Sequence, residues 1–219
     1  MTDSSGLHLQ KQGQIWILTQ QSENSTVHWQ SSSMGYWQQC LDRIESDHEP
    51  SCLIIDSSPG SDWCSGIDMQ WYLSLEQTEQ ELFQEQINQL LLRLAALSMP
   101  TLACVNGTCK QWGALLALVC DFRLMANQRA ILRFTDLKTP IATTPSTASI
   151  FAHLPPSQAL CQLVLEGRAF GAQEAVQAGL ADANWPDDEI FHQSLVFAEK
   201  LARKNRNSYT TLKRALRRF

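Results

Sequence analysis

The stretch that decides the fold is PTLACVNGTCKQWGALLALVCD, residues 100–121. It begins with a short apolar run after a proline, breaks at Asn106-Gly107, and continues as an apolar segment over residues 113–119. A short apolar run that ends in turn residues is typical of a buried strand, and the longer run that follows predicts a buried helix. The stretch therefore predicts a strand, a turn and a helix in the protein core.

Working outward, the same kinds of pattern recur on both sides of this unit. Short apolar runs predict further strands over residues 14–19, 52–56, 121–125 and 130–134. Apolar residues at helical spacing predict a helix over residues 33–47 and a longer one that starts at a capping box from Thr78 to Glu81 and ends before Pro100. The chain after about residue 146 reads as largely helical. Strands that alternate with helices indicate an α/β protein with mainly parallel pairing.

Composition indicates an ordinary globular domain. The chain has 219 residues, of which 44% are hydrophobic and 18% charged, and its net charge is −5. This charge gives no reason to expect nucleic acid or an anionic membrane as a partner. No apolar run reaches the roughly 18 residues of a membrane span, so we expect a cytoplasmic protein that does not bind membranes.

Seven cysteines are present, and they are expected to be buried, reduced thiols. The number is odd, no CxxC pair occurs, and most lie inside apolar runs. A metal site built from Cys104, Cys109 and Cys120 does not fit a known zinc spacing, and no histidine lies nearby. We therefore expect no metal.

Three segments together resemble the crotonase superfamily, the enoyl-CoA hydratase/isomerase kind of protein. Residues 100–121 resemble its signature of an apolar strand, Val-Asn-Gly, a glycine-rich turn, a helix and Cys-Asp. Residues 62–69, DWCSGIDM, resemble its Phe-Cys-Ala-Gly-x-Asp-Leu element, and residues 165–182 resemble its Thr-Gly-Arg to Gly-Leu-Val-Asp run. They occur in the family's order and at its distances. The resemblance identifies the chain as a divergent member.

The resemblance implies a spiral of β-β-α units followed by C-terminal helices. It divides the chain into a core over residues 1–185 and a helical segment over residues 186–219, on the side of trimer contacts and coenzyme A. It further implies a homotrimer or hexamer. The implied ligand or substrate is a coenzyme A thioester, with no permanently bound cofactor.

Family members bind the thioester oxygen with two backbone N–H groups, which stabilise the enolate formed next. By motif position these would be the N–H groups of Ser65 and Trp112, the latter at the start of a helix whose positive end faces the oxygen. Gly66, Asp68 and Gly113 complete the expected binding residues. The family has consecutive glycines at 111–113, whereas this chain has Gln111-Trp112-Gly113. The indole of Trp112 either points away from the pocket or fills it.

The acid/base positions depart from those of hydratases, which resemble one another in carrying two glutamates. The first position is Leu115 here, which cannot transfer a proton, so water addition by the usual route is not expected. Matching the strand pattern from Ala130 places Asp136 at the second position, whereas counting from Cys120 without gaps places Thr135 there. We favour Asp136 as the single base, although it also fits a solvated loop carboxylate.

Three functions remain open from the sequence. The first is a one-base enolate enzyme such as an enoyl-CoA isomerase, with Asp136, Ser65 and Trp112 as catalytic residues. The second is a non-catalytic protein that binds acyl thioesters or supports assembly, which the degenerate turn and a loop without glycines at residues 139–148 favour. The third is a hydratase, hydrolase or decarboxylase that takes its catalytic group from Glu76, Glu79 or Glu81.

The basic residues near the end of the chain also allow two interpretations. They could meet the phosphates of coenzyme A, or they could be solvated cations near a helix C-terminus. The residues are Lys200, Arg203, Lys204, Arg206, Lys213, Arg214, Arg217 and Arg218.

Overall fold

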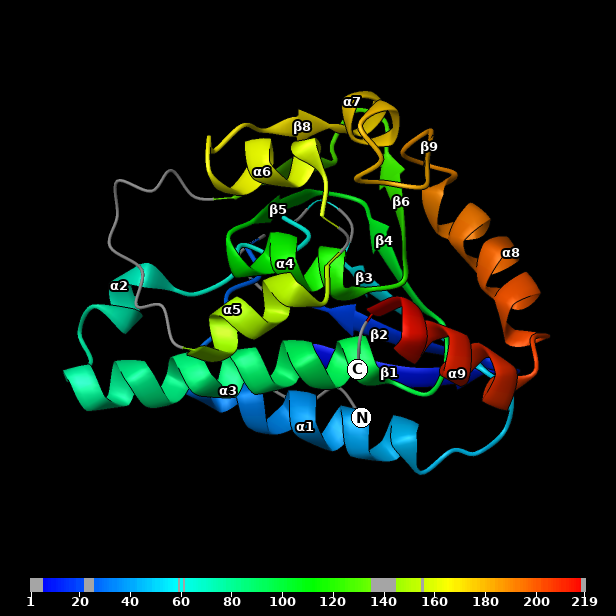
Figure 1. Cartoon of the computed structure of the whole chain (residues 1–219), viewed down its shortest axis with the longest axis horizontal. Helices are drawn as coiled ribbons and strands as arrows, with labels where there is room; N and C mark the ends of the chain where they lie inside the picture. The colour runs from blue at the N-terminus through cyan, green and yellow to red at the C-terminus, as the bar shows by residue number, and fades with distance from the viewer. Residues whose placement is uncertain are drawn as a thin grey trace.

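The computed structural model describes residues 6–21, 26–58, 60, 62–134, 145–154 and 156–217. Within these ranges the larger sheet has six strands (Figure 1), in the order β1 (Leu7–Gln12), β2 (Ile15–Gln20), β3 (Cys52–Ser57), β4 (Thr101–Val105), β6 (Phe122–Ala126) and β9 (Ala183–Trp185). β1 pairs with β2 in the antiparallel direction, and the other neighbours pair in parallel. The prediction of mainly parallel pairing is confirmed.

A second, smaller sheet stands beside the first. In the described part of the chain it contains β5 (Thr108–Lys110), β7 (Ile131–Arg133) and β8 (Phe170–Gly171). β5 follows β4 after two residues and leads directly into α4 (Trp112–Val119). The stretch that decides the fold is thus a β-β-α unit that steps from the large sheet to the small one.

Two long helices, α1 (Ser31–Glu45) and α3 (Gln77–Ala96), lie side by side below the sheet in Figure 1. Their buried residues are the predicted apolar stripes, for example Trp37 and Leu41 in α1. The predicted capping box is wrong by two residues. Glu76 is the N-cap of α3 and Glu79 closes the box, because the helix begins one residue earlier than Thr78.

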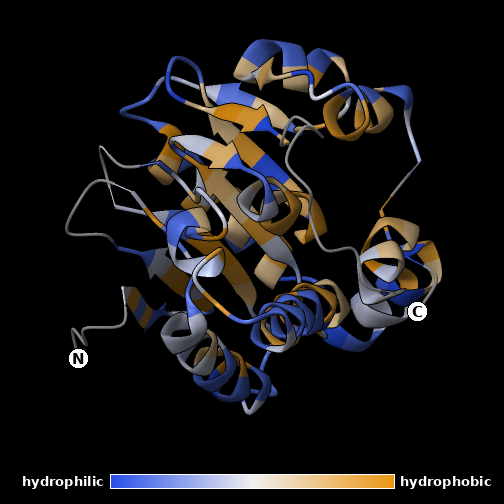
Figure 2. Ribbon diagram, turned by 90° about the vertical axis from the view of Figure 1, so that its left-hand side faces the viewer, coloured by the Kyte–Doolittle hydropathy of each residue, from blue (hydrophilic) through white to orange (hydrophobic). Residues whose placement is uncertain are grey.

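The remaining helices are short except for the last two. They are α2 (Met69–Tyr72), α5 (Pro145–Ala152), α6 (Gln158–Val164), α7 (Ala172–Gln177), α8 (Ile190–Ala202) and α9 (Arg206–Arg217). α8 packs against β2, β3 and β4 of the large sheet. Figure 2 shows hydrophobic strands at the centre of the molecule and hydrophilic helix faces around them. Among the described helices, none is both long and apolar enough to cross a bilayer.

Candidate active site

The two turns expected to form the site lie against each other. Cys64 and Cys109 form an isolated parallel β-bridge. The Lys110 N–H donates to the Cys64 carbonyl at 2.8 Å, and the Trp63 N–H donates to the Thr108 carbonyl at 3.0 Å. These bonds join the turn after β5 to the loop over residues 62–68, so Gly66, Trp112 and Gly113 are brought together as predicted from the sequence.

Close packing explains the two glycines that remain in these turns. A Cβ atom on Gly113 would lie 2.1 Å from the Cys64 carbonyl oxygen, closer than any real Cβ contact. Gly66 has a φ of +76°, and a Cβ there would lie 3.1 Å from the Trp112 nitrogen. Only glycine combines this close approach with this backbone conformation.

The Ser65 N–H does not fit its predicted role as a thioester donor. It donates to the Val27 carbonyl at 2.8 Å, and the Ser65 hydroxyl donates to Asp62 Oδ2 at 2.6 Å. A backbone donor already committed to a carbonyl cannot also bind a thioester oxygen. The Ser65 assignment is therefore corrected.

Two other N–H groups of these turns have no acceptor among the described residues. In the described residues neither Ile67 nor Trp112 donates its backbone N–H to a hydrogen-bond acceptor. Trp29 donates to the Gly66 carbonyl at 2.7 Å and accepts from the Asp68 N–H at 3.2 Å, which leaves the intervening Ile67 N–H unused. Trp112 is the first residue of α4, where helix N–H groups lack intrahelical partners and the helix dipole is positive. Sequence reasoning missed Ile67 because a backbone donor leaves no mark on residue type.

Gln111 keeps a glycine-like backbone although it is not glycine. Its φ is 50° and its ψ is −120°, and no other non-glycine residue in the described ranges has a positive φ. Such a conformation costs on the order of 1–3 kcal/mol and persists only where surrounding contacts fix it. Here the Gln111 N–H donates to the Arg133 carbonyl at 3.0 Å. The turn thus keeps the shape that presents the Trp112 N–H even though two of its glycines are lost.

The side chains of α4 supply no proton-transfer group. Leu115 is fully buried in the apolar core, and Trp112 is 2% exposed and belongs to the same core. Asp136 and Thr135, the alternatives for the base, lie outside the described residues, as does most of the loop at 139–148.

The other carboxylates predicted near the site have structural partners. Asp68 is the N-cap of α2: its Oδ1 accepts the Trp71 N–H at 3.1 Å and its Oδ2 accepts from Gln30 at 3.0 Å. The Trp71 N–H is the main cause that lowers the Asp68 pKa, against a smaller opposing effect of burial. Three glutamates proposed as alternative catalytic groups are exposed at the start of α3, where two cap the helix and one accepts from Gln77: Glu76, Glu79 and Glu81.

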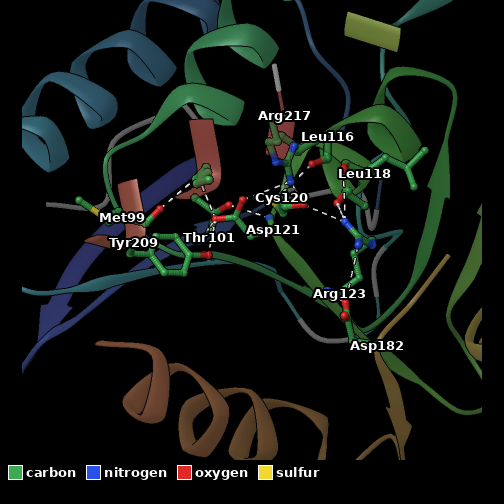
Figure 3. Close-up of polar contacts among 12 residues, drawn as sticks. Met99, Thr101, Leu116, Leu118, Cys120, Asp121, Arg123, Asp182, Tyr209 and Arg217 are labelled. Carbon is green, nitrogen blue, oxygen red and sulfur yellow. Dashed lines mark hydrogen bonds and ion pairs between the residues drawn. The ribbon is translucent and has the colours of Figure 1, made fainter. Parts of the chain in front are cut away.

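Lys213 of the basic tail is buried and Arg217 is partly buried, which neither interpretation anticipated. Lys213 Nζ lies 2.8 Å from Asp121 Oδ2, and Arg217 Nη2 lies 3.2 Å from Asp121 Oδ1. Figure 3 shows that Asp121 also accepts from the Tyr209 hydroxyl and the Thr101 N–H, both at 3.0 Å. Burial and the Asp121 charge raise the pKa of the Tyr209 hydroxyl. This network fixes α9 to the core, so Lys213 and Arg217 are not available to phosphates.

The same network surrounds the C-terminal end of α4. Arg123 donates to the carbonyls of Cys120 and Leu118 at 2.8 and 3.2 Å, and Arg217 donates to the Cys120 carbonyl at 2.7 Å (Figure 3). Cations are favourable at a helix C-terminus because the dipole is negative there. α4 therefore has guanidinium groups at one end and the free Trp112 N–H at the other.

Helix α3 carries a buried amide to which no described residue is hydrogen-bonded. Gln84 is fully buried, and neither its Oε1 nor its Nε2 makes a hydrogen bond within the described structure. One turn further on, Asn88 donates to Thr147 of α5 at 3.2 Å. An unsatisfied buried amide is unfavourable and calls for an explanation. Sequence reasoning did not single out Gln84.

Comparison with known proteins agrees with this geometry. The family model for enoyl-CoA hydratase/isomerase matches residues 32–219. A Mycobacterium leprae protein named "Probable enoyl-CoA hydratase echA12" is 29% identical over 187 residues, which are 81% of this chain and 63% of that protein. The chain thus spans less than two thirds of that relative's length. Enoyl-CoA delta isomerase 3 of Arabidopsis thaliana is 25% identical over 217 residues, 95% of this chain and 90% of the relative.

A solved structure shows the same fold. The enoyl-CoA hydratase of Bacillus anthracis superposes with a TM-score of 0.85 over 96% of this chain and 82% of that chain, at 20% identity. The predicted α/β fold of the crotonase kind is confirmed. From the family model, the shared fold and the two joined turns, it follows that the chain belongs to the enoyl-CoA hydratase/isomerase family of the crotonase superfamily.

Proposed function

We propose that this protein binds acyl-CoA thioesters and acts as a one-base enolate enzyme, such as an enoyl-CoA isomerase. The observation that carries the proposal is a pair of backbone N–H groups, at Ile67 and Trp112, that have no acceptor in the described part of the chain and lie on two turns that contact each other. Two fixed backbone donors suit a thioester oxygen, which gains negative charge as the enolate forms.

The missing glutamate supports isomerisation over hydration. A hydratase must activate water, and Leu115 cannot do so. Moving a double bond needs one group that takes a proton from C2 of a 3-enoyl thioester and returns it at C4. We assign this role to Asp136. Relatives named as delta isomerases, from Arabidopsis thaliana and Rattus norvegicus, are consistent with the assignment.

A second candidate function is binding without catalysis. It is favoured by the complete burial of Leu115 and by the bulky Trp112 at a position where the family has glycine. In that case the free N–H groups would hold a thioester that no side chain deprotonates.

The test is proton exchange in D2O. The protein is incubated with saturated and 3-enoyl CoA thioesters, and deuterium uptake and double-bond position are followed by mass spectrometry and NMR. Asp136→Asn should abolish exchange, whereas Asp42→Asn, which changes an exposed carboxylate of α1, should leave it intact. Exchange that survives Asp136→Asn would refute the base assignment. Binding with no exchange in the unaltered protein would favour the non-catalytic function.

For assembly, we propose a homotrimer or a hexamer. Leu212 and Leu216 on α9 are 64% and 84% exposed, one turn apart, as expected for a helix that contacts a neighbouring copy. Light scattering coupled to size-exclusion chromatography tests this, and a monomer at micromolar concentration would contradict it.

A further inference from the structure

A second cleft opens at the carboxyl ends of the parallel strands. Its volume is about 460 Å³, and no residue of the candidate active site lines it. Asp56 lies near the end of β3, Asn106 directly follows β4, and Asp187 comes two residues after β9. Ligands of open α/β sheets bind at this edge, outside the carboxyl ends of the strands.

Asp56 is the most buried carboxylate in the cleft, and none of the described cations pairs with it. It is 7% exposed, its Oδ1 accepts from Asn106 Nδ2 at 3.0 Å, and it forms no ion pair within the described residues. Burial raises its pKa to about 6, so it is mostly ionised at neutral pH. A neutral amide satisfies the hydrogen bond but does not neutralise the charge.

The remaining charges of the cleft leave a negative excess. Arg129 is paired with Asp187, whose Oδ2 lies 3.5 Å from the arginine Nε. Asp188, exposed on the rim, has no ion-pair partner in the described part of the chain. Two carboxylates that form no ion pair with a described residue, those of Asp56 and Asp188, therefore line one cleft.

Two apolar side chains also line the cleft. They are those of Ile190, which is buried, and of Phe191, which is 37% exposed. An aromatic face attracts cations as well as apolar groups. The described residues contain no group of three or more side chains placed to hold a metal ion, so the chemistry of the cleft suits an organic cation rather than a metal.

We propose that this cleft is a binding site for a small organic cation, an ammonium group joined to an apolar body. The ammonium would lie with the carboxylates of Asp56 and Asp188, and the apolar body against Phe191. The site is separate from the proposed thioester site and does not depend on its activity.

Benzylammonium is the probe, titrated by calorimetry and by NMR at pH 7.5, with benzyl alcohol as the uncharged match and benzoate as the anion. Benzylammonium should bind, with benzyl alcohol about tenfold weaker or more and benzoate undetectable. Asp56→Asn should weaken benzylammonium binding about tenfold or more, because it removes the buried charge. Phe191→Ala, which truncates a partly exposed side chain, should also weaken it. Glu199→Gln, the same loss of charge at an exposed residue of α8 that lines a different cleft, should have no effect.

Two results would overturn the proposal: equal binding of benzylammonium and benzyl alcohol, or no binding of benzylammonium at millimolar concentration. Binding that Asp56→Asn and Phe191→Ala both leave unchanged would place the cation elsewhere and also refute it. Proton exchange into acyl-CoA should be the same in Asp56→Asn and in the unaltered protein, so a failure of this site is distinguishable from a failure of the proposed function.

Discussion

The ammonium of Lys213 and the carboxylate of Asp121 lie 2.8 Å apart in the protein interior, with 3% and 8% of their side chains exposed. Lys213 also donates to the Met99 carbonyl at 3.1 Å. A buried charge left without its partner is strongly unfavourable, whereas an intact buried pair contributes little net stability. The pair therefore matters chiefly because it fixes where α9 docks.

Replacing Lys213 should destabilise the folded protein. Lys213→Met removes one of the positive charges that neutralise the buried Asp121 carboxylate. The free energy of unfolding, measured by urea denaturation, should therefore fall by about 3 kcal/mol. The control, Lys200→Met, removes an exposed cation of α8 and should change stability by less than about 0.5 kcal/mol. Equal effects of the two variants would show that the Asp121 network does not hold α9.

Gly113→Ala should disrupt the candidate site. The new Cβ would meet the Cys64 carbonyl at 2.1 Å, so the two turns must separate, with a loss of about 3 kcal/mol or more and loss of acyl-CoA binding. Gly35→Ala in α1, where no atom lies within 4 Å of the added Cβ, should instead stabilise the protein by up to about 1 kcal/mol. A Gly113→Ala variant that loses little stability and still binds acyl-CoA would contradict the close contact between the two turns.

Relief of strain at Gln111 should stabilise the protein. Gln111→Gly places a residue that tolerates a φ of 50° in the turn and should raise the free energy of unfolding by about 1 kcal/mol. Gln89→Gly, the same change at an exposed position inside α3, should lower it by about 1 kcal/mol. The two variants should change the free energy of unfolding, measured by heat or urea, in opposite directions. A destabilised Gln111→Gly variant would show that the glutamine side chain holds the turn.

Asp56 should make stability depend on pH. Its pKa in the folded protein is raised to about 6, above the value of roughly 3.9 in an unfolded chain, so the unfolded state ionises first as pH rises. Relative to Asp56→Asn, which stays neutral, stability should therefore fall by about 2 kcal/mol between pH 4 and pH 7. Relative to Asp68→Asn, the unaltered protein should instead gain stability as pH rises, since the pKa of Asp68 is lowered. A flat difference between the unaltered protein and Asp56→Asn over this range would contradict the burial effect.

Gln84→Leu should increase stability. The substitution keeps a similar volume and removes a buried amide that has no partner in the described structure, so we expect a gain of about 1–2 kcal/mol. Gln86→Leu, at an exposed position on the same helix, should change stability by less than about 0.5 kcal/mol. A loss of stability in Gln84→Leu would mean that the amide is satisfied in solution.

The sequence predicted the elements well because their signals are local. The apolar stripe of α1 and the runs of β3 and β4 can be read from a few neighbouring residues. The donor at Ser65 was predicted wrongly because its availability depends on the carbonyl of Val27, far away in the chain. The burial of Lys213 was missed for the same reason, since basic residues near a chain end look solvated until Asp121 is placed beside them. The contact between the two turns was predicted only through the resemblance, and the hydrogen bonds that join them could not be predicted from the sequence.

The position of Asp121 has a consequence for the order of folding. Asp121 lies between β4 and β6, whereas Tyr209, Lys213 and Arg217 lie on α9, 88 residues or more further along the chain. Contacts between such distant segments form late, because the chain between them must be ordered first. Until α9 docks, the carboxylate lacks these cations and the Cys120 carbonyl at the end of α4 lacks Arg217. Docking of α9 is therefore expected to be a late step, and it completes the polar contacts at the end of the helix that carries the Trp112 donor.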